Sequence, residues 1–318
     1  MTRSFLRDDD LTPEEQAGVL DLAAAFKADP YAAKPLAGPR TVATIYDKPT
    51  LRTQSSFSAG IAELGGHPML VDGALAGIGK RESVADVARV LGRQASVIVW
   101  RTYAQELVED MAANAGVPVV NALTDDFHPC QLLADLLTVR EHKAADGRSL
   151  GGVRVAFVGD GACNMGNSWV LAGATAGMHV VIGAPDGYAP STGMFDRANE
   201  IGTGTGGSAT WVEDPVEAVT GADVVVTDTW VSMGREDEAA ERLAVFSPYA
   251  VTEELLSHAA DDAIVMHCLP AYREKEIAGS VLDGPRSVVW EEAENRRHAQ
   301  KAVIAFLLEQ SRRGTGPS

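Results

Sequence analysis

The chain has 318 residues, of which 46% are apolar and 22% charged, and its formal net charge at pH 7 is −17. This composition is ordinary for a soluble globular protein, and the length allows two domains with their own cores. The acidic charge excludes a nucleic-acid backbone or an anionic membrane as the main partner, because neither attracts an acidic surface. An anionic substrate would need a local cluster of arginines.

The cysteines and the N-terminal residues indicate a cytoplasmic protein. Cys130, Cys163 and Cys268 are odd in number and have no paired spacing. They therefore argue for a reducing compartment and against a disulfide framework or a zinc site. The N-terminal residues lack the apolar core of a signal peptide, and no uncharged apolar run reaches the ~18 residues of a membrane span.

A helical pattern comes first, and short β-branched runs then alternate with helical stretches. Thr12, Pro13 and Glu15 mark the start of the first helix, with Thr12 and Glu15 as a capping box. Strands that alternate with helices predict parallel sheets with helices on both faces. The sequence thus predicts an α/β fold of two doubly wound, Rossmann-like domains. The predicted strands are residues 41–47, 68–72, 96–101 and 117–122, then 153–160, 179–184, 209–214, 222–230 and 262–268.

The turn-rich stretch 146–152 separates the two series of strands and predicts a domain boundary near residue 145, giving domains 1–145 and 146–318. An amphipathic helix over about 291–312 is expected to pack back on the first domain. Ligands of such open sheets lie beyond the carboxyl ends of the strands. Six strands lead directly into polar segments, which predicts an active site in the cleft between the domains.

The run "VAFVGDGACNMGNS" raises the alternative of a dinucleotide site. Gly159 and Gly161 provide the first two glycines of G-x-G-x-x-G, but Asn164 takes the place of the third. The nearest acid after the second strand, Asp186, lies beyond a proline. A partial motif of this kind is weak. Asn164, at a predicted helix start, is better suited to a carboxylate or amide of a ligand.

Three further segments, "FHPCQLLADLLT", "DTWVSMGRE" and "HCLPAYR", together resemble the ornithine carbamoyltransferases of the aspartate/ornithine transcarbamoylase superfamily. The resemblance extends over nearly the whole chain. It implies an N-terminal carbamoyl phosphate domain, a C-terminal ornithine domain, a homotrimer, and no metal or organic cofactor. The implied reaction carbamoylates the side-chain amine of L-ornithine to give L-citrulline and phosphate in arginine biosynthesis.

Carbamoyl phosphate is an anion, so its site needs cations and the backbone N–H groups of a helix start. Arg101 is the strongest candidate, since an arginine rarely ends a buried strand without an anionic partner. The segment "TLRT", taken alone, is more typical of an ordinary capped helix with a surface arginine. By resemblance Thr53, Arg101 and His128 stabilise the oxyanion. The implied carbamoyl phosphate residues are Thr50, Leu51, Arg52, Thr53, Lys80, Arg101, His128, Gln131, Cys268, Leu269 and Arg296.

The resemblance also assigns the ornithine site. Asn164 and the Met233 N–H suit the α-carboxylate, and Asp228 and Ser232 suit the α-ammonium. Cys268 pairs with Asp228 near the attacking amine, where an acidic group can take up a proton. The implied catalytic residues are Cys268, Asp228, His128 and Arg101.

Three positions depart from the family pattern: Leu51 replaces a hydroxyl, Gln54 an arginine and Gly77 a glutamine. Lys80 is expected to compensate. Two alternatives remain, namely a paralogous transcarbamoylase that acts on a different amine and a non-catalytic regulatory relative.

Overall fold

All strand pairs in the two sheets of this protein are parallel, as the alternating pattern predicts. The computed structural model describes residues 2–144, 149–231 and 236–314. One sheet has four strands in the order β2-β1-β3-β4 and the other has five in the order β7-β6-β5-β8-β9. The predicted α/β fold with two parallel sheets is confirmed.

The chain forms two units. The first comprises the chain up to Leu137 and from Glu294 onward, and the second comprises Thr138–Ala293. Helices α6 (Pro129–Lys143) and α13 (Val289–Gly314) therefore each pass from one unit into the other. Within the described residues, no helix combines the length and apolar character needed to cross a membrane.

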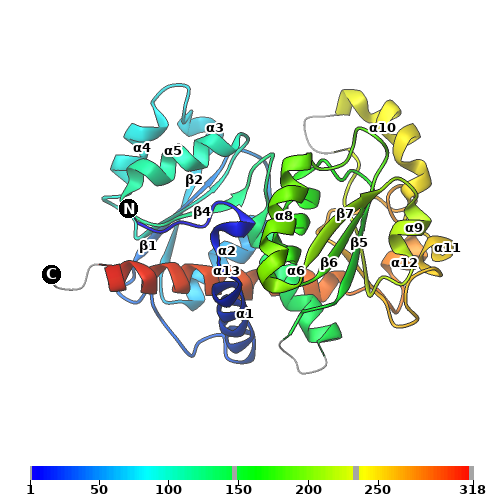
Figure 1. Ribbon diagram of the computed structural model, residues 1–318. Helices are drawn as coiled ribbons and strands as arrows, with labels where there is room; N and C mark the ends of the chain where they lie inside the picture. Colours follow the sequence, from blue (N-terminus) through cyan, green and yellow to red (C-terminus); the bar gives the residue numbers. More distant parts are fainter. Residues whose placement is uncertain (1, 145–148, 232–235, 315–318) are drawn as a thin grey trace. The chain divides into compact units, whose positions relative to one another are not determined.

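The first unit places its sheet between two layers of helices (Figure 1). Helices α4 and α5 cover one face, and α1, α2 and α13 lie on the other. The buried amine of Lys301 in α13 fixes the second layer, because its Nζ donates to Glu63 Oε2 and to the Pro30 carbonyl oxygen, both at 2.6 Å. The elements are α1 (Pro13–Ala28), β1 (Thr41–Tyr46), α2 (Arg52–Glu63), β2 (His67–Asp72), α3 (Gly73–Ala76), α4 (Val84–Leu91), β3 (Val97–Arg101), α5 (Gln105–Ala115) and β4 (Val119–Leu123).

The predicted capping box of the first helix is confirmed. Glu15 N donates to Thr12 Oγ1 at 3.3 Å, and Thr12 N donates to Glu15 Oε2 at 3.0 Å. Pro13 occupies the first turn, where its missing N–H costs no hydrogen bond.

The second unit has the same layered plan, with α8 on one side of its sheet and α9, α11 and α12 on the other (Figure 1). Its elements are β5 (Arg154–Val158), α7 (Asn164–Thr175), β6 (His179–Gly183), α8 (Thr192–Thr205), β7 (Ser208–Val212), α9 (Pro215–Val219), β8 (Val224–Thr227), α10 (Ala239–Phe246), α11 (Glu253–Leu256), β9 (Ile264–His267) and α12 (Gly279–Leu282).

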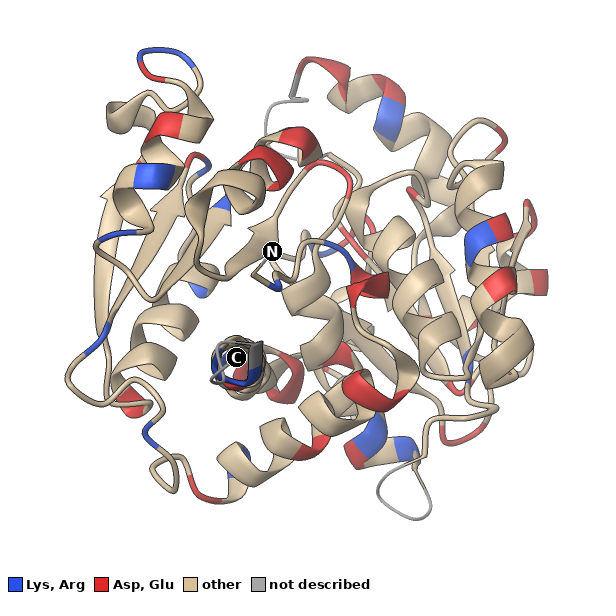
Figure 2. Ribbon diagram, turned by 60° about the vertical axis from the view of Figure 1, so that its left-hand side comes forward, with Lys and Arg blue, Asp and Glu red and all other residues tan. Residues whose placement is uncertain are grey.

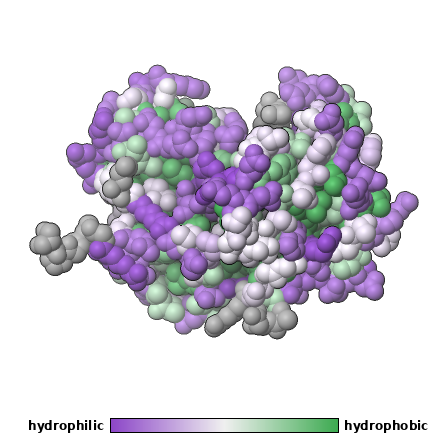
Figure 3. Space-filling view, in the orientation of Figure 1, coloured by the Kyte–Doolittle hydropathy of each residue, from purple (hydrophilic) through white to green (hydrophobic). Residues whose placement is uncertain are grey.

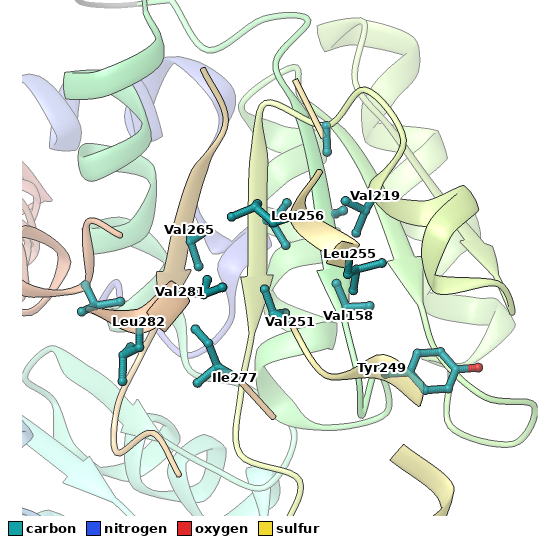
Figure 4. Close-up of a cluster of buried hydrophobic side chains, with 14 residues drawn as sticks. Val158, Val219, Tyr249, Val251, Leu255, Leu256, Val265, Ile277, Val281 and Leu282 are labelled. Atoms are coloured by element: carbon teal, nitrogen blue, oxygen red, sulfur yellow. The ribbon is translucent and has the colours of Figure 1, made fainter. Parts of the chain in front are cut away.

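The core of the second unit explains how its central strands are held. Val158, Val225 and Val265 come from β5, β8 and β9 and pack against Leu255 and Val281 of α11 and α12 (Figure 4). Burial of each such side chain contributes about 1.5–3 kcal/mol. This packing fixes the carboxyl ends of β8 and β9 side by side, with Thr227 in register with His267.

The surface carries the acidic charge in a dispersed form. Asp and Glu lie on helices and loops of both units with Lys and Arg between them (Figure 2). Hydrophilic side chains cover much of the visible face of each unit (Figure 3). The net charge of −17 therefore does not come from a single acidic segment.

Candidate active site

Two buried guanidinium groups of the first unit converge on one hydroxyl group. Arg296 Nη2 donates to Thr53 Oγ1 at 2.9 Å, and Arg101 Nη1 approaches the same oxygen at 3.5 Å. Thr53 is 1%, Arg101 7% and Arg296 4% exposed. Three distant segments meet here: the end of β3, the first turn of α2, and α13. Buried cations beside a helix start form a site for an anion with several oxygens.

His128 and Gln131, at the start of α6, extend this group. Gln131 Oε1 accepts from Arg296 Nη1, and Gln131 Nε2 donates to Asp135 Oδ1 at 2.7 Å. Burial, followed by the charges of Arg296, Arg101 and Lys48, holds the pKa of His128 well below its ordinary value. The imidazole is therefore neutral at physiological pH and has one N–H to donate and one nitrogen to accept.

The remaining residues of the predicted carbamoyl phosphate set lie nearer the surface. Leu51 is the N-cap of α2 and is 78% exposed, while Thr50 and Arg52 on either side are half-buried. Lys80 is exposed in the loop that follows α3. Gly77, before it, has φ +66° and ends α3 in a left-handed conformation that favours glycine.

A second polar group lies at the carboxyl ends of β8 and β9 in the second unit. The Cys268 thiol donates to Asp228 Oδ1 at 3.2 Å. The same oxygen accepts from the backbone N–H of Thr229 at 2.7 Å. Both side chains are half-buried. Because parallel strands end at the same edge, residues 40 positions apart form a direct thiol–carboxylate pair.

His267, which directly precedes Cys268, is completely buried. Its Nδ1 accepts from the Leu269 N–H at 2.9 Å, so the ring N–H is on Nε2. Nε2 lies 3.3 Å from Oε1 of Glu276, which is 1% exposed. Leu269 has φ +56°, in the left-handed region, and the bond to His267 Nδ1 holds it there. His267 thus shapes the turn that carries Cys268.

Asp228, His267 and Cys268 place ligand atoms within 4.8 Å of one another, a grouping that could hold a metal ion. Both ring nitrogens of His267 already face other partners, namely the Leu269 N–H and Glu276 Oε1. A metal at this position would have to break one of these contacts. The arrangement therefore fits a structural imidazole beneath a thiol–carboxylate pair better than a three-ligand site.

Asn164 begins α7 directly after the glycine turn of β5. The glycines of this turn serve close packing, since a Cβ on Gly161 would lie 2.5 Å from Ile182 Cγ2 and one on Gly166 would lie 2.1 Å from the Gly161 carbonyl oxygen. The turn therefore brings the N-terminus of α7 against the sheet. Ser232 and Met233 lie outside the described residues.

The other two cysteines are kept as thiols. Burial raises the pKa of Cys130 to about 12. Burial, with the charges of Asp160 and Asp228, raises the pKa of Cys163 well above its ordinary value. Neither side chain forms a ready thiolate, which is the form that acts as a nucleophile.

Comparison with known proteins explains these two groups. Residues 3–141 match the family "Aspartate/ornithine carbamoyltransferase, carbamoyl-P binding domain". Residues 151–307 match "Aspartate/ornithine carbamoyltransferase, Asp/Orn binding domain". The chain belongs to the aspartate/ornithine carbamoyltransferase family. The cationic group lies in the first matched segment apart from Arg296, and the thiol–carboxylate pair lies in the second.

Individual members of the carbamoyltransferase family are similar over almost their whole length. The ornithine carbamoyltransferase of Clavibacter michiganensis subsp. michiganensis is 61% identical over 311 residues, which are 98% of this chain and 100% of that protein. The ornithine carbamoyltransferase structure from Pyrococcus furiosus is 43% identical, with a TM-score of 0.90 over 96% of each chain. The anabolic enzyme from Campylobacter jejuni is 34% identical, with a TM-score of 0.91 over 97% of this chain and 99% of that one.

Three residues near the two groups were not predicted from the sequence. Tyr46 ends β1 beside Arg101, Glu276 faces His267, and Arg242 is bonded to the segment after Asp228. Tyr46 had the same signal as Arg101, a polar residue at the end of an apolar strand. Glu276 and Arg242 lie in charged stretches that are typical of a solvated surface, and only their burial distinguishes them.

Proposed function

We propose that this protein is an ornithine carbamoyltransferase, which transfers the carbamoyl group of carbamoyl phosphate to the side-chain amine of L-ornithine. The products are L-citrulline and phosphate, and the reaction serves arginine biosynthesis. The observation that carries the proposal is the convergence of Arg101 and Arg296 on Thr53 in the first unit. The names of the relatives, which are 51–61% identical, support the choice of ornithine as the acceptor.

In the proposed reaction the first unit binds carbamoyl phosphate. Arg52, Arg101 and Arg296 hold its anionic oxygens, and the start of α2 adds backbone N–H donors. The neutral imidazole of His128 donates to the carbamoyl oxygen, and Gln131 orients the carbamoyl amine. As the amine attacks, the carbonyl oxygen becomes an oxyanion, and cations already in place stabilise it without reorganisation.

The second unit binds ornithine. Asp228 and Asn164 hold its α-end, together with Ser232 and Met233. The side-chain amine of ornithine must lose a proton before it can attack, because its ordinary pKa is near 10.4 if lysine is the guide. Cys268 and Asp228 share a hydrogen bond at 3.2 Å and can accept this proton. The new C–N bond forms, the C–O bond to phosphate breaks, and phosphate leaves. The carbonyls of Cys268 and Leu269 orient the carbamoyl amine.

We further propose a division of roles near residue 145, between the matched segments 3–141 and 151–307. Residues 1–145 would bind carbamoyl phosphate and residues 146–318 ornithine, with the C-terminal helix, about 291–312, packing on the first domain. None of Cys130, Cys163 and Cys268 is in a disulfide, which supports a cytoplasmic location. We expect a homotrimer in solution.

The decisive experiment is citrulline production by the purified protein from carbamoyl phosphate and ornithine. A panel of other amines, including putrescine and lysine, tests the choice of acceptor. Citrulline formation at a rate well above that with every other amine is the expected result. Faster carbamoylation of another amine would make the protein a paralogous enzyme, and binding of carbamoyl phosphate without turnover on any amine would make it a non-catalytic relative.

A further inference from the structure

Tyr46 lies next to Arg101 in the sheet of the first unit. The two residues are direct partners in the parallel register of β1 and β3. Register partners on parallel strands project toward the same face of the sheet. The neighbouring strand residues Ile45 and Trp100 belong to the core cluster on the opposite face, with α4 and α5. Tyr46 and Arg101 therefore both point to the face covered by α2 and α13, which carry Thr53 and Arg296.

The hydroxyl of Tyr46 is buried without a hydrogen bond. Tyr46 Oη has almost no exposed surface and, among the described residues, no partner at hydrogen-bond distance. The neighbouring Thr44 hydroxyl, which lowers the Tyr46 pKa, does not have hydrogen-bond geometry toward Tyr46 Oη and donates instead to the Met69 carbonyl oxygen at 3.4 Å. A buried hydroxyl that forms no hydrogen bond costs free energy, so its position in the structure needs an explanation. This atom is available to a ligand.

We propose that the Tyr46 hydroxyl is a binding group for carbamoyl phosphate and donates a hydrogen bond to an anionic oxygen that Arg101 and Arg296 also hold. The inference rests on the proposed function of the first unit. No covalent step is involved, since the phenol keeps its proton and only the hydrogen bond is new.

The electrostatics of Tyr46 agree with a donor. Burial raises its pKa to about 12, although Thr44, Arg101 and Arg296 act in the opposite direction. The phenol is therefore protonated throughout the physiological range. The charges of Arg101 and Arg296 both act on this pKa, in keeping with the face of the sheet that the strand register assigns to Tyr46.

The test is Tyr46→Phe, which removes one oxygen and keeps the ring. We expect the Kd for carbamoyl phosphate, measured by calorimetry, to rise roughly tenfold or more, as for other hydrogen bonds to a charged group. The KM for ornithine and the thermal midpoint should stay within error. Tyr103→Phe is the matched control, because Tyr103 is in the same unit and is 51% exposed. It should leave the Kd unchanged.

A Kd for Tyr46→Phe within twofold of the wild-type value would overturn the inference, as would an equal loss in Tyr103→Phe. A lower thermal midpoint with an unchanged Kd would make Tyr46 a packing residue and would also overturn it. Citrulline production by the wild-type protein tests the proposed function separately. If the wild type binds carbamoyl phosphate but makes no citrulline, the proposed function is wrong. The Kd of Tyr46→Phe for carbamoyl phosphate then still decides whether Tyr46 is a binding group.

Discussion

Replacement of Arg242 is expected to weaken both the second unit and the ornithine site. Arg242 is 3% exposed and forms a buried ion pair with Asp160, in the turn after β5. Its Nε donates to the Trp230 carbonyl oxygen at 2.5 Å, and its guanidinium lies 5.1 Å from the centre of the Phe246 ring. Trp230 follows Asp228 by two residues. Arg242 thereby fixes α10 to the segment that carries the proposed catalytic carboxylate.

The size of the effect follows from the burial of both partners. The Asp160 side chain is 9% exposed, so Arg242→Met would leave a carboxylate that is almost entirely out of water. Breaking a buried ion pair from one side costs about 3–5 kcal/mol, because the remaining charge is uncompensated. The methionine keeps most of the apolar stem, so the loss reports the charge and not the packing. The double variant Arg242→Met with Asp160→Asn removes both charges and should recover part of that loss.

This prediction is tested by the urea midpoint of unfolding, followed by tryptophan fluorescence. Trp230, which is stacked on Phe246, is a local reporter. The KM for ornithine should rise in Arg242→Met while the Kd for carbamoyl phosphate stays unchanged, because the perturbation is confined to the second unit. Arg273→Met is the control, since its ion pair with Asp283 is solvent-exposed and its loss should not move the urea midpoint. A midpoint for Arg242→Met equal to that of the control would refute the reasoning.

Three further outcomes are expected. Cys268→Ala should lower kcat far more than it changes the Kd for carbamoyl phosphate. An unaltered kcat would show that the Cys268 side chain has only a packing role. Arg52→Ala should abolish carbamoyl phosphate binding measurable by calorimetry. Leu51→Thr should change the Kd for carbamoyl phosphate by about tenfold or less, because the backbone N–H of residue 51 is retained. Binding by Arg52→Ala at the wild-type level would show that the anion site is misplaced. Burial and neighbouring cations lower the pKa of His128 in the folded protein. Below about pH 6.5 the imidazole of His128 therefore takes up a proton in the unfolded chain but not in the folded one, and the free energy of unfolding falls as the pH decreases. His128→Gln should flatten that decrease in urea titrations between about pH 6.5 and 5, and an identical slope in both proteins would contradict it.

Local patterns were enough to predict the fold class and the first helix start. Short apolar, β-branched runs separated by helical stretches predict parallel strands, and a capping box depends only on Thr12 and Glu15. The positions of Arg101, Asp228 and Cys268 also followed from the sequence. Each stands at the carboxyl end of a strand or just beyond it, and in a parallel sheet all such ends lie on one edge.

The partners of these residues were decided by the tertiary structure. Strand alternation does not specify the order β7-β6-β5-β8-β9, in which β8 and β9 are neighbours and Asp228 and Cys268 at their ends come together. The Tyr46 hydroxyl became a candidate donor because the register sets it beside Arg101. Arg242 and Asp160 are 82 residues apart, and the sequence around either residue does not predict their ion pair. Sequence periodicity reports which face of an element is buried, but the group that lies across from it depends on packing between elements that are distant in the chain.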